Sequence, residues 1–247
     1  MMRAAVYSGS RNLYPDMVPA MKSLIANSSV DKIYLLIEDD KFPEALPPLV
    51  ETVNVSGQTT FPPDGPNMKS CYTYMALMRS CYDKLFPDLD KILSLDVDTI
   101  VVDDIDELWD IKLGRKWVAC CEEKFTTHHP YGIQYFNIGV AMFNLDEIRK
   151  TGASDQLIEL LNKERLPWVE QDGWNKLGYP RKILELPTRF NENFMCGFTE
   201  EPAIVHYCGW LNWQGNPQVY RREYIKKYRE MSWEEALACQ KNRKKKS

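Results

Sequence analysis

Hydrophobic and polar positions follow two rhythms along this chain, one typical of strands and one typical of helices. Short apolar runs bounded by polar or turn-forming residues predict strands. Apolar residues spaced three and four apart predict helices. The predicted strands are 4–7, 32–37, 50–55, 91–95, 118–121, 139–143 and 203–207, and the predicted helices are 15–26, 68–86, 146–163 and one or two over 220–240.

The alternation of strands and helices predicts an α/β fold with a mostly parallel central sheet and helices on both faces. The 247 residues suffice for one such domain, and neither an internal repeat nor a dividing linker interrupts them. In open sheets of this kind, ligands bind beyond the carboxyl ends of the strands. Polar residues that directly follow an apolar run are therefore the candidates for chemistry.

Composition and charge narrow the class of protein. The formal net charge is −4, which gives no signature of a nucleic-acid-binding protein. The seven cysteines form no C-x-x-C pair, so neither a zinc framework nor a redox motif is indicated. The first apolar run is too short for a signal-peptide core and no stretch reaches the length of a membrane span, so we expect a cytoplasmic protein.

The C-terminal segment departs from this charge balance. Basic residues outnumber acidic ones from Arg221 onward, and the run 241–246 is almost entirely basic. Such runs are commonly solvated tails. The same charges also suit a peripheral contact with anionic lipid at the inner membrane surface.

Two carboxylates follow the fourth predicted strand. If the chain stays extended there, Asp96 and Asp98 lie on the same side, because strand side chains alternate. Two hard oxygen ligands suit Mn²⁺ or Mg²⁺, and a diphosphate would complete the coordination. Asp104 and Asp106 form a second Asp-x-Asp match in a predicted polar turn, so the position at a strand end distinguishes the first pair. An EF-hand is rejected because Val101 stands where the calcium loop needs glycine.

Polar residues at three other positions can be interpreted either as structural or as functional residues. His206 follows a short apolar run and is either a hydrogen-bonded structural histidine or a metal ligand. Asn137 stands where a loop becomes a strand, and its amide either bonds sugar hydroxyls or starts the strand. The run 170–172 places two acids around a glutamine, which also suits the first turn of a helix.

In their order and spacing, these places resemble glycosyltransferase family 8, the retaining enzymes that include glycogenin, the bacterial lipopolysaccharide galactosyltransferases and the galactinol synthases. The most specific segment is 95–102 with 108–111. The other matching segments are 12–14 with 20–24, Arg79 with 85–87 and 90–93, 135–140, 171–172 and 206–209. The resemblance implies a single nucleotide-diphospho-sugar transferase domain of the GT-A type, with a catalytic part at 1–216 and C-terminal helices and a basic tail at 217–247.

The resemblance also implies ligands and roles. Asp96, Asp98 and His206 are expected to hold Mn²⁺, with Mg²⁺ as the alternative, and the metal to grip the diphosphate of a UDP-sugar. Tyr14 is expected to lie against uracil, with Asn12 near the base or ribose. The full donor-binding set is Tyr7, Ser8, Asn12, Tyr14, Asp96, Val97, Asp98, Gly209 and Asn212. The set near the donor sugar is Arg79, Asn137, Glu170, Gln171 and Asp172, with Gln171 beside the anomeric carbon.

Two departures from the family pattern stand out. Glu170 replaces the Asp that commonly precedes the glutamine. The lysine that usually follows the His-x-x-Gly segment and touches the donor phosphate is absent, and Asn212 or Gln214 stands near its place. A cation there helps a departing diphosphate. The absence of this lysine implies a slower enzyme, an unusual donor, or a phosphate contact that is made instead by Arg221, Arg222 or Arg11.

The implied reaction moves a hexose, glucose or galactose, from a UDP-sugar to a hydroxyl group of a glycan or lipid-linked acceptor with retention of configuration. The carbonyl of Gln171, with Glu170 or Asp172, would ease positive charge on the sugar. A covalent intermediate and a front-face route both stay open. The candidate acceptor loops are 125–134 and 190–200, which are rich in aromatic and polar residues.

Two other functions fit parts of the pattern. A sugar nucleotidyltransferase also combines an α/β sheet with a divalent metal, but only 8–11 faintly matches its glycine-rich loop with arginine. A UDP-sugar-binding protein that has lost catalysis would fit the missing lysine. Transfer of a nucleotide from UTP distinguishes the first, and binding without turnover distinguishes the second.

Overall fold

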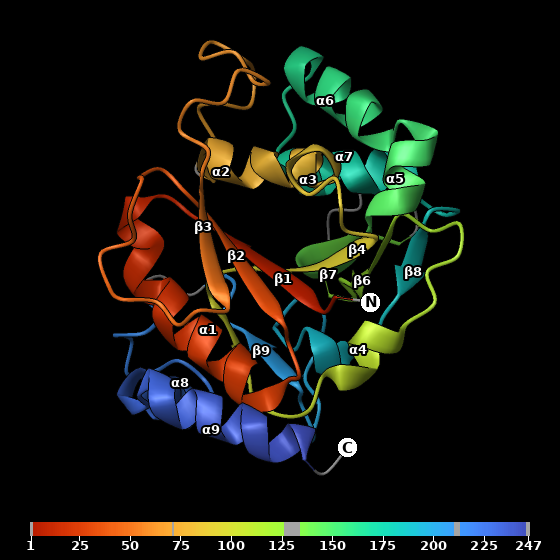
Figure 1. The fold of residues 1–247 in the computed structure, drawn as a ribbon. Helices are drawn as coiled ribbons and strands as arrows, with labels where there is room; N and C mark the ends of the chain where they lie inside the picture. Colours follow the sequence, from red (N-terminus) through yellow and green to blue (C-terminus); the bar gives the residue numbers. More distant parts are fainter. Residues whose placement is uncertain (1, 71, 126–133, 210–212, 246–247) are drawn as a thin grey trace.

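A seven-stranded sheet forms the centre of the structure, with the strand order β3-β2-β1-β4-β7-β6-β8 (Figure 1). The structure is a computed structural model and describes residues 2–70, 72–125, 134–209 and 213–245. The strands are β1 (Ala4–Ser8), β2 (Lys32–Ile37), β3 (Val50–Asn54), β4 (Lys91–Leu95), β6 (Val118–Glu122), β7 (Phe136–Asn144) and β8 (Ile183–Glu185). All except the short edge strand β8 were predicted.

Every strand of this sheet except β7 runs in one direction. The parallel pairs are β1 with β2 and β4, β2 with β3, and β6 with β8, whereas β7 is antiparallel to its neighbours β4 and β6. The predicted mostly parallel sheet is therefore confirmed. Because the parallel strands share a direction, their carboxyl ends meet at one edge, where a ligand site is expected.

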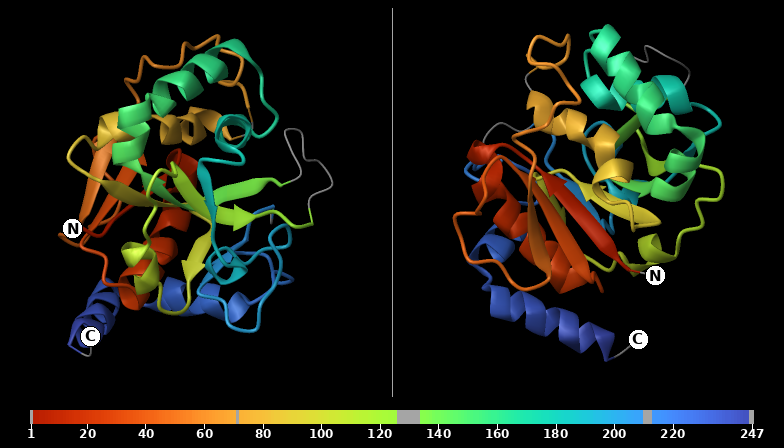
Figure 2. Two further views of the ribbon diagram at one scale, coloured as in Figure 1. Left: turned by 90° about the vertical axis from the view of Figure 1, so that its right-hand side faces the viewer. Right: turned by 45° about the horizontal axis from the view of Figure 1, so that its top comes forward.

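Helices cover both faces of the sheet, as predicted (Figures 1 and 2). In β1, Tyr7 joins the hydrophobic cluster that contains Met21, and Val6 joins the cluster that contains Trp174, because successive strand side chains point to opposite faces. One layer holds α1 (Tyr14–Asn27), α8 (Arg222–Glu230) and α9 (Trp233–Lys244). The other holds α2 (Thr73–Leu77), α3 (Tyr82–Leu85), α5 (Leu145–Thr151), α6 (Ala153–Lys163) and α7 (Val169–Gly178).

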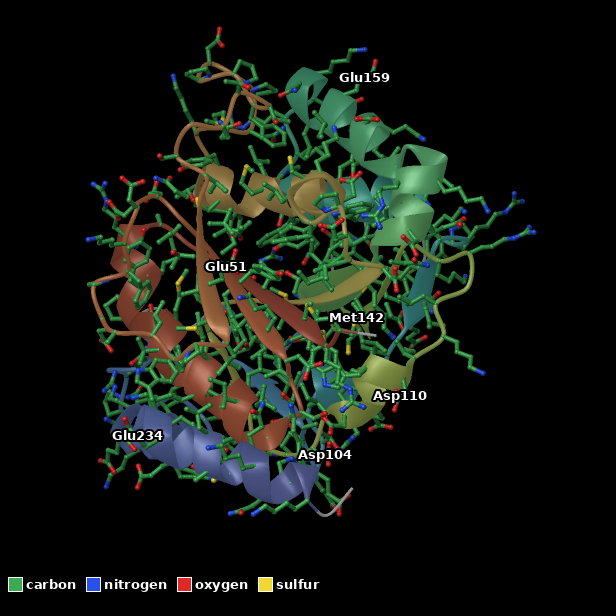
Figure 3. All side chains as sticks on the ribbon, viewed as in Figure 1. Glu51, Asp104, Asp110, Met142, Glu159 and Glu234 are labelled. Carbon is green, nitrogen blue, oxygen red and sulfur yellow. The ribbon has the colours of Figure 1, made fainter. Side chains whose placement is uncertain are left out.

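The outer faces of these layers carry exposed charged side chains. Figure 3 shows Glu159 of α6 and Glu234 of α9 projecting outward from opposite layers, whereas Met142 of β7 is buried between them. The remaining short elements are α4 (Asp106–Asp110), which follows the predicted polar turn, and the 3-10 turns η1 (Arg11–Leu13), η2 (Met78–Cys81) and η3 (Thr188–Phe190).

A second, two-stranded sheet links segments that are far apart in the sequence. β5 (Thr99–Val101) pairs antiparallel with β9 (Ile204–His206), and Thr99 lies opposite His206. β9 is the predicted strand near residue 205, but β5 was not predicted because its apolar run is only three residues long. The pairing brings the end of β9 to the turn that leaves β4.

The predicted single helix at 68–86 is wrong, because this segment forms α2, η2 and α3 in succession. Before α2, the Asn67 side chain bonds backbone groups of the α6–α7 connection and holds the chain in turns. Within the segment, the helix tightens at η2, where the buried side chain of Arg79 reaches the carbonyl of Ile138. Tertiary contacts override the apolar periodicity here.

The predicted helix at 146–163 is also broken in two. Gly152 has a φ of 65° and ends α5 in the left-handed conformation that glycine adopts most readily. The side chain of Asn144, rather than that of Asp146, caps α5 by accepting from the amide of Glu147 at 3.2 Å. The apolar spacing continues across the glycine, so periodicity alone did not show the break.

The C-terminal region forms two helices, one of the two alternatives that the sequence left open. Asn27 of α1 donates to the Tyr228 hydroxyl at 2.6 Å, and Gln240 donates to the carbonyl of Val30 at 2.8 Å. These bonds tie α8 and α9 to the N-terminal part of the chain. The division at residue 216 stays a prediction.

Two cations of the basic tail are paired within the protein itself. Arg243 forms an ion pair with Asp104, and Lys244 lies 3.2 Å from Asp31. Fewer positive charges of the tail are therefore free to contact an anionic lipid surface than the sequence indicated. Contact with lipid and a cytoplasmic location both stay predictions. None of the described helices combines the length and apolarity needed to cross a bilayer.

Replacing Gly152 with alanine is expected to lower the free energy of unfolding by about 1–2 kcal/mol, because an L-residue is strained at positive φ. Gly57→Ala is a matched control: the added Cβ of either variant meets no atom within 4 Å, but φ is not positive at Gly57. Urea unfolding followed by circular dichroism measures both. Equal losses in the two variants would contradict this account of the break between α5 and α6.

Candidate metal centre and surrounding site

Asp96, Asp98 and His206 come together beyond the carboxyl end of β4. The His206 Nε2 atom lies 3.5 Å from Asp96 Oδ2 and 3.3 Å from Asp98 Oδ1. One potential ligand atom from each residue lies within 4.8 Å of the other two. The structure thus assembles the three predicted metal ligands at the predicted edge of the sheet.

A turn, rather than an extended strand, aims the two carboxylates. The amide and hydroxyl of Thr99 donate to the carbonyl of Asp96 at 3.2 and 2.7 Å, and the amide of Asp96 donates to the carbonyl of Gly139 at 2.7 Å. The chain is therefore not extended from Asp96 to Asp98, which was the condition for both side chains to lie on one side of a strand. They converge because the turn closes between β4 and β5, and the pairing of β5 with β9 supplies His206.

His206 is held in the orientation of a metal ligand. Its side chain is only 2% exposed, and its Nδ1 atom lies 2.8 Å from Asn191 Oδ1. The Asn191 amide nitrogen donates to Asn137, so the oxygen faces the ring and Nδ1 carries the hydrogen. Nε2 then presents a lone pair to the carboxylates, and it has no hydrogen-bond partner among the described residues. This donor set fits a hard divalent cation.

The electrostatics keep a ligand carboxylate ionised. Partial burial tends to raise the pKa of Asp98, but a protonated His206, through its charge and its hydrogen bond, and the charge of Arg79 outweigh burial, and the pKa lies below its usual range. A cation bound in place of that proton would act on Asp98 in the same direction. Arg79 also donates to Asp96 and places its Nη1 atom 3.6 Å from Glu170 Oε1. Burial raises the pKa of Glu170, which Arg79 only partly offsets. The Arg79 charge is thus shared between two acids of the site.

Gln171 is the centre of a buried hydrogen-bond network. Its carbonyl oxygen accepts from the amide of Ile138 at 3.1 Å, and its nitrogen donates to Glu123 and to the Tyr135 hydroxyl, both at 3.2 Å. Asn137 donates to the same Glu123 oxygen at 2.8 Å. The Gln171 carbonyl keeps one lone pair that can face a ligand. Asn137 and Gln171 are therefore oriented by one carboxylate.

Glu123 and Asn191 were missed in the sequence analysis. Glu123 follows the strand β6, as Asp96 follows β4, so the same rule was able to find it. Asn191 lies in an irregular segment after η3, and no pattern marks it. Both act on predicted site residues through their side chains.

Asp172 belongs to the scaffold of the site. It is wholly buried, and its two oxygens accept from the Tyr135 hydroxyl at 2.6 Å and from the backbone amide of Trp168 at 2.8 Å. The structural interpretation, an acid in the first turn of a helix, therefore describes Asp172 better than a direct role at the reacting centre.

On the nucleotide side, several predicted contacts use their side chains internally. The Tyr7 hydroxyl donates to the carbonyl of Ala20 and the Ser8 hydroxyl to that of Met75. The fully buried Tyr7 side chain therefore cannot meet a ligand, and the Ser8 hydroxyl can offer one only an acceptor. Tyr14 is buried, with its ring 5.1 Å from that of Phe42. Its place against uracil stays a prediction, as do the roles of the exposed Asn12 and Gly209 and of the buried Val97. Asn212 lies outside the described residues.

The arginines named as substitutes for the missing lysine are largely occupied. Arg11 forms a two-oxygen contact with Asp39, and Arg221 binds Glu192 and the carbonyl of Thr199. Arg222 is exposed on α8. A phosphate bound by Arg11 or Arg221 would have to share the charge of the guanidinium with a carboxylate.

Asp16 of α1 lies in a polar contact with the segment after β9. The Gln214 amide nitrogen donates to Asp16 and to the carbonyl of Pro15, and Arg229 of α8 donates to the Gln214 oxygen at 3.0 Å. Burial, and to a smaller degree the nearby charge of Asp98, raise the pKa of Asp16 to about 6, against the opposing effects of Gln214 and Arg229.

Three exposed phenylalanines border the site. Phe125, Phe194 and Phe198 are 68%, 44% and 63% exposed and belong to the two loops predicted to bind an acceptor. The amide of Phe125 donates to the carbonyl of Met195 at 3.0 Å, so the two loops touch. Residues 126–133 of the first loop lie outside the described residues. We name Phe125, Phe194 and Phe198 the aromatic rim.

Comparison with known proteins places this geometry in a family. Residues 20–214 match the family described as Glycosyl transferase family 8. A putative glycosyltransferase of Haemophilus influenzae is 26% identical over 163 residues, covering 57% of this chain and 48% of that protein. Glycosyltransferase GlyE of Streptococcus pneumoniae is 29% identical over 175 residues, covering 66% of this chain and 40% of that protein. The chain spans about half the length of the curated relatives it matches.

Solved structures share the fold. The crystal structure of GlyE superposes with a TM-score of 0.76 at 23% identity and covers 99% of this chain and 64% of that chain. A crystal structure of the galactosyltransferase LgtC with donor and acceptor sugar analogs superposes with a TM-score of 0.72 at 20% identity, covering 96% and 99%. The predicted GT-A fold is confirmed.

Gly139→Ala is expected to weaken Mn²⁺ binding at least about tenfold, because the new Cβ would lie 2.2 Å from a His206 ring carbon and 2.6 Å from Asp96 Oδ2. Isothermal titration calorimetry with Mn²⁺ measures the loss. Gly178→Ala, whose Cβ would have the Ile183 side chain at 3.2 Å and Trp117 at 3.7 Å as its nearest neighbours, is a steric control with unchanged Mn²⁺ affinity. Wild-type affinity in Gly139→Ala would contradict the assigned centre.

Asp16→Asn is expected to stabilise the metal-free protein at alkaline pH. A carboxyl group whose pKa is higher in the folded chain destabilises the fold once it ionises, so the cost appears as the pH rises through about 6. The gain in unfolding free energy should be about 1–3 kcal/mol at pH 8 and near zero at about pH 4. Urea unfolding at the two pH values tests this; a gain independent of pH would contradict it.

Proposed function

Because the chain belongs to glycosyl transferase family 8, we propose that it moves a hexose, glucose or galactose, from a UDP-sugar to a hydroxyl group of a glycan or lipid-linked acceptor, with Mn²⁺ and retention of configuration. The observation that carries the proposal is the convergence of Asp96, Asp98 and His206 beyond the carboxyl end of β4. A metal ion held there would bind a donor diphosphate, and the second nitrogen of His206 faces two carboxylates without a hydrogen-bond partner among the described residues, as a metal ligand would.

Asp96, Asp98 and His206 are the residues that would hold Mn²⁺, and Mg²⁺ is the alternative. The ion supplies positive charge against the charge that grows on the departing diphosphate. The protein supplies the rest of the arrangement: Asn191 fixes the histidine ring, and Arg79 fixes Asp96. A preorganised group costs no reorganisation during the reaction.

The network around Gln171 is the proposed place of the reacting sugar. Gln171 offers a carbonyl lone pair toward the positive charge that develops at the anomeric carbon. Glu123 orients Gln171 and Asn137 together, so that their amides present fixed donors and acceptors to the sugar hydroxyls. Glu170, paired at 3.6 Å with Arg79, lies one residue away and adds negative charge nearby.

The described carboxylates favour a front-face route over a covalent intermediate. A carboxylate nucleophile must reach the far face of the sugar with a free oxygen. Asp172 has both oxygens occupied, and Glu170 and Glu123 are almost fully buried against Arg79 and the Gln171 network. In the front-face route, the leaving phosphate itself assists the incoming hydroxyl, so no such carboxylate is needed.

The aromatic rim is the proposed acceptor-binding surface. Phe194 packs beside Gly209, three residues after His206, and Phe198 meets Tyr220 edge-on at 5.3 Å. The Tyr220 hydroxyl donates to the carbonyl of His206 at 2.9 Å. The rim is thus fixed to the same segment as the metal centre, and exposed aromatic faces suit the apolar faces of sugar rings.

A UDP-release assay with Mn²⁺ tests the proposed function. UDP-glucose, UDP-galactose and their N-acetyl forms are offered without an acceptor, and slow release from one donor is expected. Asp98→Asn should lower the rate at least about 100-fold, because a metal ligand is lost. Asp104→Asn alters the second Asp-x-Asp match, which pairs with Arg243 on the surface, and should leave the rate unchanged.

Each other outcome has its own meaning. Binding of UDP with Mn²⁺ without release from any donor, even with mixed glycan acceptors, would identify a UDP-sugar-binding protein without catalysis. Transfer of a nucleotide from UTP to a sugar phosphate would identify a nucleotidyltransferase. Lack of UDP binding in the presence of Mn²⁺ would overturn the proposal.

A further inference from the structure

A bound diphosphate needs more positive charge than one divalent ion supplies. The described arginines differ in whether a carboxylate already neutralises the guanidinium. A metal-bound UDP keeps a net negative charge that cationic side chains stabilise. Arg79, Arg11 and Arg221 each lie against at least one carboxylate. Arg229 has no carboxylate within ion-pair distance among the described residues, and its two bonds go to a neutral oxygen of Gln214.

A short chain of contacts connects Arg229 with the metal centre. The amide of Tyr207 donates to the carbonyl of Asp98 at 2.9 Å, and the ring of Trp213 stacks on that of Tyr207 at 5.0 Å. Gln214 follows Trp213 and binds Arg229. Gln214 also donates to Asp16, and the charges of Asp98 and Arg229 act on the pKa of Asp16 with opposite signs, so both groups lie within electrostatic range of Asp16.

Gln214 separates two charges that would otherwise pair. Its nitrogen side faces Asp16 and the carbonyl of Pro15, and its oxygen side faces Arg229. The amide therefore satisfies the carboxylate and the guanidinium without neutralising either one. It also fixes the guanidinium plane through Nε and Nη2 and leaves the Nη1 donors without a partner among the described residues.

We propose that Arg229 binds the diphosphate of the donor and that Gln214 is the positioning residue that keeps this arginine oriented and unpaired. The inference rests on the proposed function, because it needs a diphosphate at the metal centre. Arg229 lies on α8, and the C-terminal helices thereby become part of the donor site. A guanidinium with free donors suits phosphate oxygens, and its charge stabilises UDP as the glycosyl bond breaks.

Calorimetric titration of UDP and of UMP in saturating Mn²⁺ tests the proposal on the full chain. Arg229→Gln is expected to weaken UDP about tenfold or more and UMP less, because UMP carries one phosphate. Gln214→Glu should also weaken UDP, because the new carboxylate would pair with Arg229. Lys226→Gln removes an equal charge from an exposed position one turn earlier on α8 and should change UDP affinity less than about twofold.

Two further measurements separate a direct contact from a structural effect. Mn²⁺ affinity should stay unchanged in Arg229→Gln, whereas the melting temperature should fall slightly because the buried Gln214 oxygen loses two donors. Arg229→Lys, which keeps the charge, should recover part of the UDP affinity. UDP binding by Arg229→Gln at the wild-type level, or an equal loss in Lys226→Gln, would overturn this inference alone. If the wild-type protein failed to bind UDP with Mn²⁺, the proposed function would fall and this inference with it.

Discussion

Backbone hydrogen bonds between β5 and β9 hold His206 against the turn that carries Asp96 and Asp98. The turn places the carboxylates, and the small sheet adds a ligand from the far end of the chain. The close approach is possible only because residue 139 has no side chain: a Cβ there would overlap His206 and Asp96. The network around Gln171 and the proposed place of Arg229 are both built outward from this junction.

Buried acids around the junction are matched by specific donors. Arg79 forms ion pairs with Asp96 and Glu170, and Arg221 forms one with Glu192. Asn137 and Gln171 donate hydrogen bonds to Glu123. An unpaired buried carboxylate would protonate or destabilise the fold, so these pairs keep negative charge in place before any ligand arrives. The site is therefore rigid and anionic on its own, which favours a divalent cation and leaves the nucleotide dependent on cations further out.

The two layers of helices have different parts in this arrangement. The layer of α2, η2, α3 and α7 supplies Arg79, Glu170 and Gln171 to the side where the sugar is proposed to react. The layer of α1, α8 and α9 supplies Asp16 and Arg229, and Gln214 joins them from the segment after β9. A donor bound at the metal centre would thus contact both layers across the edge of one sheet.

The sequence by itself determined the α/β class and most of the strands, because these depend on local apolar runs that are readable along the chain. The resemblance to one family, carried by the order and spacing of its motifs, named the candidate metal ligands that the structure brings together. Only the tertiary structure decided that a turn aims Asp96 and Asp98, that Asp172 is a scaffold residue, that Glu123 and Asn191 bind site residues, and that Gln214 holds Arg229. Each of these follows from contacts between segments that are distant in sequence. A local sequence pattern does not indicate which distant backbone or side-chain group will form a hydrogen bond with a buried polar group. The breaks at η2 and Gly152 have the same origin, because contacts and a left-handed glycine override a periodicity that continues across them.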